Sequence, residues 1–352
     1  MKNFLVVSLM LLLLIALILP SCAQPAPAPA PSPAPAPTPP PAPPKITTLR
    51  YTSALPIVHY STDGMNMFAD KVKAKTNGQV IIEVYPGGKL FKQTESPDAI
   101  RTGAVDIAMN SNDHVQGYLP VLSWTIYSYM TLTAEQFHKI MPKLREIDAP
   151  LFKEKLNAKF LYYNRYTDLG INSKTPIKSP SDLKGLRVRV PTGVFADNVS
   201  LWGGNPQSMS SSEVYNALSK GTLDACLTSS ATVTSRKFYE VAKYFVKPIS
   251  WSYYEVYMNL DSWNTLSKEN QAAIEEVIKE LEPITWKQIT DDMASSDKFL
   301  KDNITLYDLS PAEVKQWGNL ALGAYDKFKA DMATKGYAEQ LKQIEQLVSS
   351  AR

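Results

Sequence analysis

Short apolar runs alternate with segments of helical spacing from residue 46 onward. Runs of β-branched and apolar residues are typical of strands, and apolar residues three or four positions apart are typical of helices. The elements predicted in the first half are strands at 46–51, 80–85 and 105–109, a helix carrying Met65, Phe68, Ala69 and Val72, and a helix beginning at Ser96-Pro97. This β-α-β-α-β order predicts a mainly parallel sheet covered by helices.

The second half repeats the same order. It contains predicted strands at 186–190 and 222–227, a helix after Pro191-Thr192-Gly193, and a helix from about 211 to 221. The segment AIxxGxVDxxM at 99–109 matches ALxxGxLDxxL at 217–227 position for position. Each segment is typical of a helix, a glycine cap and a buried strand. We interpret the two segments as equivalent elements of two lobes, the alternative being chance similarity between two αβ units.

From residue 267 onward the pattern predicts mainly helices that cover the lobes. It predicts an amphipathic helix at 268–287, a strand at 304–308, and a helix start at the SPAE sequence of 310–313. Charges of alternating sign indicate a solvated helix face. In parallel sheets of this kind, ligand sites lie beyond the carboxyl ends of the strands.

The first 44 residues carry a secretion signal and a spacer. Lys2 precedes an apolar run over residues 4–19, which predicts a signal peptide at 1–21. The LPSC sequence that ends at Cys22 resembles the lipobox of bacterial lipoproteins, and this resemblance implies lipidation of Cys22. Residues 22–44 are rich in proline and alanine, which predicts an extended polyproline II tether of about 70 Å.

Composition and motifs exclude several classes of function. A net charge of +3 gives no basic surface for nucleic acid. The two cysteines and three histidines have no metal-ligand spacing, so no metal site is predicted. The sequence contains no dinucleotide or P-loop cradle and no serine-nucleophile motif, so we expect neither a cofactor nor enzymatic activity.

Two arginines on one predicted strand are the main candidates for ligand chemistry. In LRVRVP at 186–191, alternation places Arg187 and Arg189 on the same strand face, and Arg189 is near the carboxyl end. A guanidinium at that end can bind a carboxylate through two parallel hydrogen bonds. The pattern alone leaves two interpretations open, which are a solvated or ion-paired arginine and a ligand clamp.

A series of motifs lies before and after this strand in a fixed order. The motifs are SPSDLKGLRVRVP at 179–191, GNP at 204–206, SEVYxAL at 212–218, Asp224 and KFYEV at 237–241, with TxGxV at 76–80, YPGGxL at 85–90 and LSxExQ at 266–271. Over nearly all of residues 46–340 the chain resembles the solute-binding proteins of tripartite ATP-independent periplasmic (TRAP) transporters. The resemblance implies an α/β, periplasmic-binding-protein-like fold, with two αβ lobes around a ligand cleft, crossing hinge strands and long helices. Lobe I is expected at 45–165 plus about 256–294, and lobe II at about 166–255 plus 295–352.

The resemblance also implies ligand contacts in the second lobe. Arg189 occupies the position of a carboxylate clamp, whereas Arg187 is expected to pair with a protein carboxylate. Where many relatives have DGQENP, this chain has DACLTS, so Thr228 takes the place of a ligand-binding asparagine. A second position that is often arginine aligns with Leu169, and Arg165 is close enough in sequence to compensate.

Further contacts are expected from the first lobe and from aromatic residues. The first-lobe contacts are the loop at 54–59, Gln93, Glu95, Asn110 and Ser111. The aromatic residues near the expected cleft are Tyr60, Trp124, Tyr127, Trp251, Tyr253 and Tyr254. Each aromatic ring has the alternative role of covering a helix. Together with Leu169, they predict an apolar or aromatic monocarboxylate as the ligand, with Trp251 and Tyr254 in contact with it.

The sequence therefore predicts an extracytoplasmic, lipid-anchored receptor that binds an organic acid and delivers it unchanged to a TRAP permease. The expected partners are the small acid, the membrane subunits of the permease, and the lipid bilayer through the N-terminal anchor. The expected location is the periplasm or the cell surface. The alternative is a ligand-sensing module for a signalling receptor that uses the same cleft.

Overall fold

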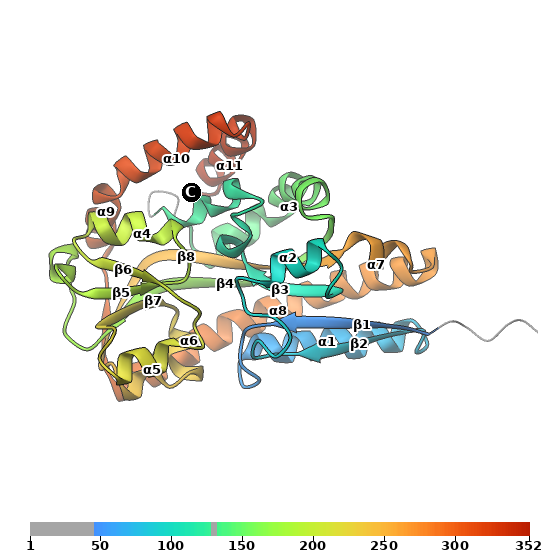
Figure 1. Ribbon diagram of the computed structural model, residues 1–352, viewed down its shortest axis with the longest axis horizontal. Coiled ribbons are helices and arrows are strands. Elements are labelled where there is room, and N and C mark those ends of the chain that lie inside the picture. The colour runs from blue at the N-terminus through green and yellow to red at the C-terminus, as the bar shows by residue number, and fades with distance from the viewer. Residues whose placement is uncertain (1–45, 128–131) are drawn as a thin grey trace, which may run out of the picture. The chain divides into compact units, whose positions relative to one another are not determined.

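One mixed sheet with helices on both of its faces forms the centre of the fold (Figure 1). A computed structural model describes residues 46–127 and 132–352, apart from the side chains of residues 165 and 166. Across the sheet the strands follow the order β2 (Val80–Tyr85), β1 (Thr47–Ser53), β3 (Ile107–Ser111), β8 (Tyr244–Asn259), β4 (Ala158–Ser173), β7 (Ala225–Thr228), β5 (Arg187–Val190) and β6 (Asn205–Ser208), and β9 (Thr305–Asp308) pairs with β8. The predicted α/β class is confirmed.

The sheet has two parallel parts that run toward each other. Strands β2, β1 and β3 are parallel, as are β7, β5 and β6. Between them lie β4 and β8, each 16 residues long, which pair antiparallel with each other and with the neighbouring strands. Ser111 at the carboxyl end of β3 pairs with Tyr254, and Thr228 at the carboxyl end of β7 pairs with Gly170. The two sets of carboxyl ends therefore meet near the middle of the crossing strands.

Helices connect the strands and cover the sheet. The α-helices are α1 (Tyr60–Lys75), α2 (Ser96–Arg101), α3 (Ala134–Leu156), α4 (Val194–Leu201), α5 (Val214–Ser219), α6 (Ser230–Ser235), α7 (Leu260–Asn264), α8 (Lys268–Asn303), α9 (Pro311–Leu320), α10 (Leu322–Thr334) and α11 (Ala338–Ala351). Short 3-10 helices are η1 (Asn112–Val115), η2 (Pro120–Ile126), η4 (Pro180–Leu183) and η5 (Phe238–Glu240).

Capping residues fix several helix ends. Thr133 and Gln136 form a capping box at the start of α3, and Asn157 ends that helix in the left-handed conformation with φ of 48°. Ser310 and Glu313 form a second capping box at the start of α9. This confirms the helix start predicted from the SPAE sequence.

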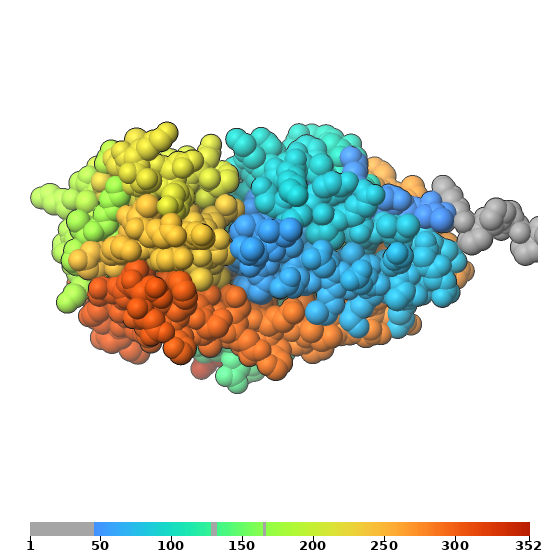
Figure 2. Space-filling view, turned by 90° about the horizontal axis from the view of Figure 1, so that it is seen from below, coloured from blue at the N-terminus to red at the C-terminus, as the bar shows by residue number. Residues whose placement is uncertain are grey.

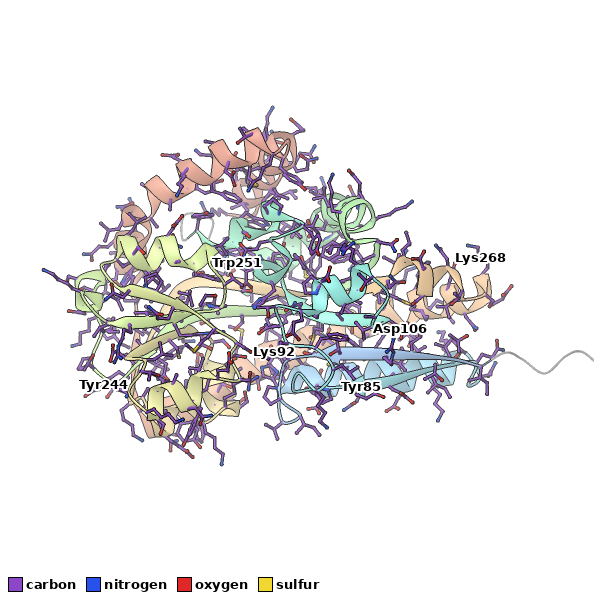
Figure 3. The ribbon with its side chains drawn as sticks, in the orientation of Figure 1. Tyr85, Lys92, Asp106, Tyr244, Trp251 and Lys268 are labelled. Carbon is purple, nitrogen blue, oxygen red and sulfur yellow. The ribbon has the colours of Figure 1, made fainter. Side chains whose placement is uncertain are left out.

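Helix α8 is longer than predicted and packs against both parts of the sheet. It continues beyond residue 287 because apolar positions recur at Ile289 and Leu300. Leu281 packs in one core with α1, β1 and β2, whereas Leu300 packs in another with α5, α6 and β7. Figure 3 places Lys268, at the start of α8, on the opposite side from Tyr244, at the start of β8. From below, α8 in orange lies across the blue and the yellow parts of the chain (Figure 2).

The matched segments of the two halves occupy equivalent positions. Asp106 accepts hydrogen bonds from the backbone N of Arg50 at 2.8 Å and from its Nε at 3.3 Å. Asp224 accepts the same two bonds from Arg187, both at 2.9 Å. The glycine of each segment has a left-handed φ, 75° in the first and 73° in the second. The interpretation of the segments as equivalent elements is therefore confirmed.

Candidate ligand-binding site

The carboxyl ends of the parallel strands enclose a cavity beside the crossing strands. It contains about 450 Å³ of space that no protein atom fills, within the range of roughly 300–1,000 Å³ typical of small-molecule sites. Its walls consist of Leu55, Gln93, Ser111, Asp113, His114, Thr167, Leu169, Arg189, Pro191, Phe195, Ser211, Thr228, Ser229, Thr232, Ser252 and Tyr254. These residues come from both parts of the sheet.

Arg189 lies in the cavity wall with 3% of its surface exposed. Its Nε donates to the carbonyl of Met209 at 2.9 Å, and its Nη1 donates to the carbonyl of Leu227 at 3.1 Å. Within the described part of the chain it forms no ion pair with a carboxylate. Burial lowers the pKa of Arg189 to about 10, because the charged form is poorly hydrated there. The two carbonyls orient the guanidinium and leave Nη2 available to a ligand.

Arg187, two residues earlier on β5, has a different environment. Its Nε and Nη2 bind the two carboxylate oxygens of Asp224 at 2.9 and 2.8 Å. Nη2 also donates to the carbonyl of Gly221 at 2.7 Å. The prediction that Arg187 pairs with a protein carboxylate is confirmed. Of two arginines on one strand face, only the exposed one has its counter-ion within the described residues.

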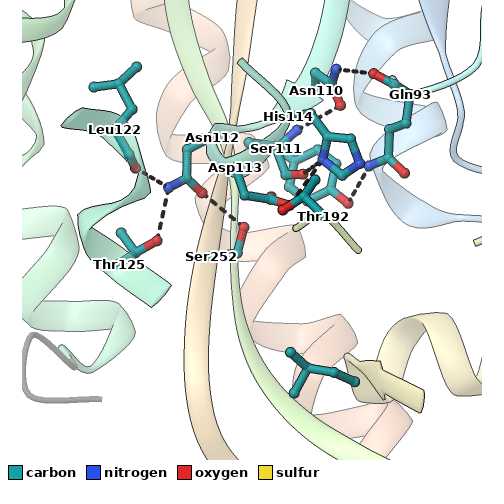
Figure 4. A network of polar contacts seen from close by, with 12 residues as sticks. Gln93, Asn110, Ser111, Asn112, Asp113, His114, Leu122, Thr125, Thr192 and Ser252 are labelled. Atoms are coloured by element: carbon teal, nitrogen blue, oxygen red, sulfur yellow. Dashed lines mark hydrogen bonds and ion pairs between the residues drawn. The ribbon is translucent and has the colours of Figure 1, made fainter. Parts of the chain in front are cut away.

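A polar network follows β3 on the other side of the cavity (Figure 4). Thr192, just after β5, donates from Oγ1 to Asp113 Oδ2 at 3.1 Å. His114 Nδ1 lies 3.2 Å from the same oxygen and 2.7 Å from Ser111 Oγ. Burial raises the pKa of Asp113, but His114 and hydrogen bonds from Ser111 and Thr192 outweigh this and hold the pKa below its ordinary value. Asp113 is therefore an ionised carboxylate in the cavity wall.

A second buried arginine connects the two sides near the cavity. Arg236, which follows α6, donates from Nη2 to the carbonyl of Ala54 in the loop after β1 at 2.9 Å. Its Nε is buried and has no hydrogen-bond partner among the described residues. Burial lowers the pKa of Arg236, and its charge in turn lowers the pKa of Arg189. With two guanidinium groups and one carboxylate, Asp113, the surroundings of the cavity favour an anion.

Six of the predicted contacts line the cavity, namely Arg189, Thr228, Ser111, Gln93, Leu169 and Tyr254. The predictions for three others are corrected. Asn110 donates from Nδ2 to the carbonyl of Gln93 at 2.7 Å and holds the start of α2 against β3. Glu95 is exposed and accepts a hydrogen bond from the backbone N of Lys92 at 2.9 Å. Trp251 is fully buried away from the cavity.

Trp251 belongs to an aromatic core on the face of β8 opposite to the cavity. Its ring centroid lies 5.2 Å from Trp124 and 5.1 Å from Phe137, and the centroids of Phe137 and Tyr253 are also 5.1 Å apart. Trp251 and Tyr253 share this face by alternation, and Tyr254 points to the other face and lines the cavity. Figure 3 shows Trp251 under the helical layer.

Most of the polar wall was not predicted from the sequence. Hydroxyl groups dominate it, and they belong to Ser111, Thr167, Ser211, Thr228, Ser229, Thr232 and Ser252. Available signals were the polar run NSNDH at 110–114 and the TSS sequence at 228–230, each directly at the end of an apolar strand. Phe195, at the start of α4, was also missed.

Two predicted functional residues lie outside the described part, Cys22 and the side chain of Arg165. The signal peptide, tether and lipid anchor, like the compensating role of Arg165, stay predictions. Over residues 46–127 and 132–352, no helix is both long and apolar enough to cross a lipid bilayer.

Comparison with known proteins identifies the family of this site. The DctP family model, described as "Bacterial extracellular solute-binding protein, family 7", matches residues 53–331. The chain belongs to this family. Its members are solute-binding proteins of transport systems rather than enzymes, and they act outside the cytoplasm.

Relatives with a named ligand share between a quarter and a third of their residues with this chain. It is 29% identical over 213 residues to the 2,3-diketo-L-gulonate-binding periplasmic protein YiaO of Escherichia coli (strain K12), which covers 59% of this chain and 64% of YiaO. It is 28% identical over 224 residues to the C4-dicarboxylate-binding periplasmic protein DctP of Rhodobacter capsulatus, which covers 62% of this chain and 66% of the relative.

Solved structures confirm the predicted periplasmic-binding-protein-like fold. A TRAP periplasmic solute binding protein from Desulfovibrio salexigens, with bound orotic acid, matches with a TM-score of 0.80 at 21% identity over 87% of this chain and 99% of that chain. The corresponding values for one from Rhodoferax ferrireducens, with bound malonate, are 0.79, 22%, 86% and 98%.

Proposed function

We propose that this protein captures a small organic carboxylate through Arg189 and delivers it to a TRAP-type membrane permease. The observation that carries this proposal is the buried guanidinium of Arg189, which lines the cavity without a carboxylate partner among the described residues. A buried charge without a partner is costly, so that ligand binding supplies the missing counter-ion. A ligand carboxylate accepts parallel N–H bonds from a guanidinium that two backbone carbonyls already orient.

The ligand that we propose is a polar acid rather than the apolar or aromatic acid predicted from the sequence. That earlier prediction depended on aromatic residues near the cleft, and Trp124, Trp251 and Tyr253 lie in the core instead. The cavity presents mainly hydroxyl groups, with Phe195 and Tyr254 as its aromatic residues. TRAP solute-binding proteins of the same fold were solved with β-D-galacturonate, pyroglutamic acid and malonate, which supports a small polar carboxylate.

Binding is proposed to close two lobes about the crossing strands. The expected lobe boundaries, 45–165 plus about 256–294 and about 166–255 plus 295–352, divide β4 and β8 at nearly the same level. Arg165 on β4 lies opposite Tyr254 on β8, so both strands would bend at one place. The Thr192–Asp113 and Arg236–Ala54 bonds span this division and would form on closure.

Delivery to the permease requires the protein to stay at the membrane surface. We propose lipidation at Cys22 and a tether over 22–44, in the periplasm or on the cell surface. Membership of a transport family supports a permease as partner in preference to a sensor kinase.

The test is a thermal-stability and calorimetric screen of the purified protein against sugar acids, keto acids, hydroxy acids and aromatic acids. A ligand that binds only the folded state raises its stability. Arg189→Lys keeps the charge but removes the planar fork, so the response to an active acid should disappear. Arg187→Lys makes the same change two residues away at an exposed ion pair and should leave the response intact. A response that survives Arg189→Lys would refute the clamp, and no response to any acid would refute carboxylate binding.

A further inference from the structure

Asp113 is the acidic group in a cavity that otherwise favours anions. It is 2% exposed and belongs to η1, directly after β3, so the rigid sheet fixes its position. Both His114 and Thr192 contact its Oδ2 atom. A carboxylate that only favoured closure would not need a place in the cavity wall, yet Asp113 lines the same cavity as Arg189.

The opposite charges of Arg189 and Asp113 give the cavity a polarity. They interact electrostatically, since Asp113 raises the pKa of Arg189 against the effect of burial. A ligand carboxylate bound at Arg189 therefore has an ionised oxygen acceptor within reach of its field. An ionised carboxylate accepts hydrogen bonds and donates none, so it binds a hydroxyl or amide N–H and repels a second carboxylate.

We infer that Asp113 determines specificity by selecting monocarboxylates that carry a hydroxyl or amide donor away from the acid group and by rejecting dicarboxylates. This inference rests on the proposed function of Arg189 as the carboxylate clamp. It names the chemical class of the ligand, since one end of the acid must be anionic and the other must donate a hydrogen bond. The neighbouring hydroxyl groups of Ser111 and Ser252 can bind a ligand of either class and do not discriminate between them.

Asp113 also takes part in the bond that spans the cavity, and the two roles can be separated. Thr192→Val removes the Oγ1 donor to Asp113 and leaves the carboxylate in place. Asp113→Asn preserves the shape of the side chain and an oxygen acceptor for Thr192, but removes the negative charge. A role in closure predicts equal effects on all acids, whereas a role in specificity predicts a change in the ratio of affinities.

The probes are two pairs of acids with the same carbon skeleton, 3-hydroxypropionate with malonate and D-gluconate with D-glucarate. Within each pair the far end is either a hydroxymethyl group or a second carboxylate. Dissociation constants are measured by titration calorimetry with the purified full-length chain. In a pair that binds, the wild type should prefer the hydroxy acid by about tenfold or more, because like charges repel strongly in a buried site. Asp113→Asn should reduce this preference to within about threefold, and Thr192→Val should weaken both acids and keep the preference.

Three outcomes would overturn the inference. The first is a wild-type chain that binds the diacid as tightly as the hydroxy acid, a measurement that needs no variant. The second is an unchanged preference in Asp113→Asn. The third is a preference that Thr192→Val abolishes, which would assign discrimination to closure. If these pairs bind but Arg189→Lys has no effect on affinity, the proposed clamp fails, and this result is distinct from all three.

Discussion

Replacing Arg189 by methionine should abolish acid binding and leave the ligand-free protein about as stable as the wild type. Burial lowers the pKa of this guanidinium from 12.5 to about 10. At about 1.4 kcal/mol for each pKa unit, this difference of about 2.5 corresponds to about 3 kcal/mol against the charged form in the folded protein. Because the pKa still lies above neutral pH, the group is charged at pH 7 and the full cost is present; it falls away only as the pH rises through 10.

Two hydrogen bonds act in the opposite direction. Nε and Nη1 bind the carbonyls of Met209 and Leu227, and bonds from a charged donor contribute about 1.5–3 kcal/mol each. Methionine restores part of the packing but leaves both carbonyls without these donors. The opposing contributions cancel to within about 2 kcal/mol, although a buried side chain with two hydrogen bonds is lost. This near-neutral result is the expected mark of an arginine retained for its ligand rather than for the fold.

The assay is urea unfolding of ligand-free protein followed by tryptophan fluorescence, combined with calorimetric titration of an active acid. Arg187→Met is the matched control, because it breaks an ion pair with Asp224 on the same strand. It should lose stability and keep its affinity for the acid. A loss of more than about 3 kcal/mol in Arg189→Met would refute the reasoning, because the arginine would then have a structural role.

Three other changes test the same structure. Burial raises the pKa of Asp148 to about 7, so the folded protein binds this proton more tightly than the unfolded chain, and the carboxyl destabilises the fold increasingly as pH rises from about 4 to about 7. Asp148→Asn should therefore gain stability over the wild type between pH 4 and pH 8, by at most about 4 kcal/mol in urea unfolding, and a constant difference would contradict this assignment. A Cβ at Gly170 would overlap the backbone of β8 and approach the Phe245 ring to 2.8 Å, so Gly170→Ala should lower the unfolding free energy by about 3 kcal/mol or more, whereas wild-type stability would show that β4 can move aside. Arg236→Gln removes the charge that binds the Ala54 carbonyl and should speed acid dissociation by about tenfold in stopped-flow displacement, with an unchanged rate as the contrary result.

The strands of the parallel parts could be predicted because they are short apolar runs separated by clear turn signals. Two elements could not be derived from the pattern. Strand β8 is buried along almost its whole length on both faces, so it shows no alternation of apolar and polar residues. Strand β6 has the sequence NPQS and is mainly exposed, and its only mark as a strand is its pairing with β5. The resemblance to a known family, rather than periodicity, indicated that crossing strands exist.

The candidate site was predictable where the chemistry belongs to one position and unpredictable where it depends on distant partners. Arg189 could be identified from its place at the end of an apolar strand. The pairing of Arg187 depends on Asp224, 37 positions away, and only the family resemblance favoured it. Asn110 has the residue type of a ligand contact, but its amide binds the backbone before α2. Asp113 appears in the sequence as one polar residue in a polar run, and its place in the wall follows from the turn of η1.

Helix α8 makes this molecule a natural strain gauge. Its 36 residues extend about 54 Å, and its two ends are buried in separate cores. Any rotation of one core against the other must therefore be taken up within the helix itself. Pro283, just after Leu281, removes a backbone hydrogen bond and marks the place where bending is easiest. A pair of fluorophores on the exposed faces to either side of Pro283 would convert solute capture into an optical signal without touching the binding cavity.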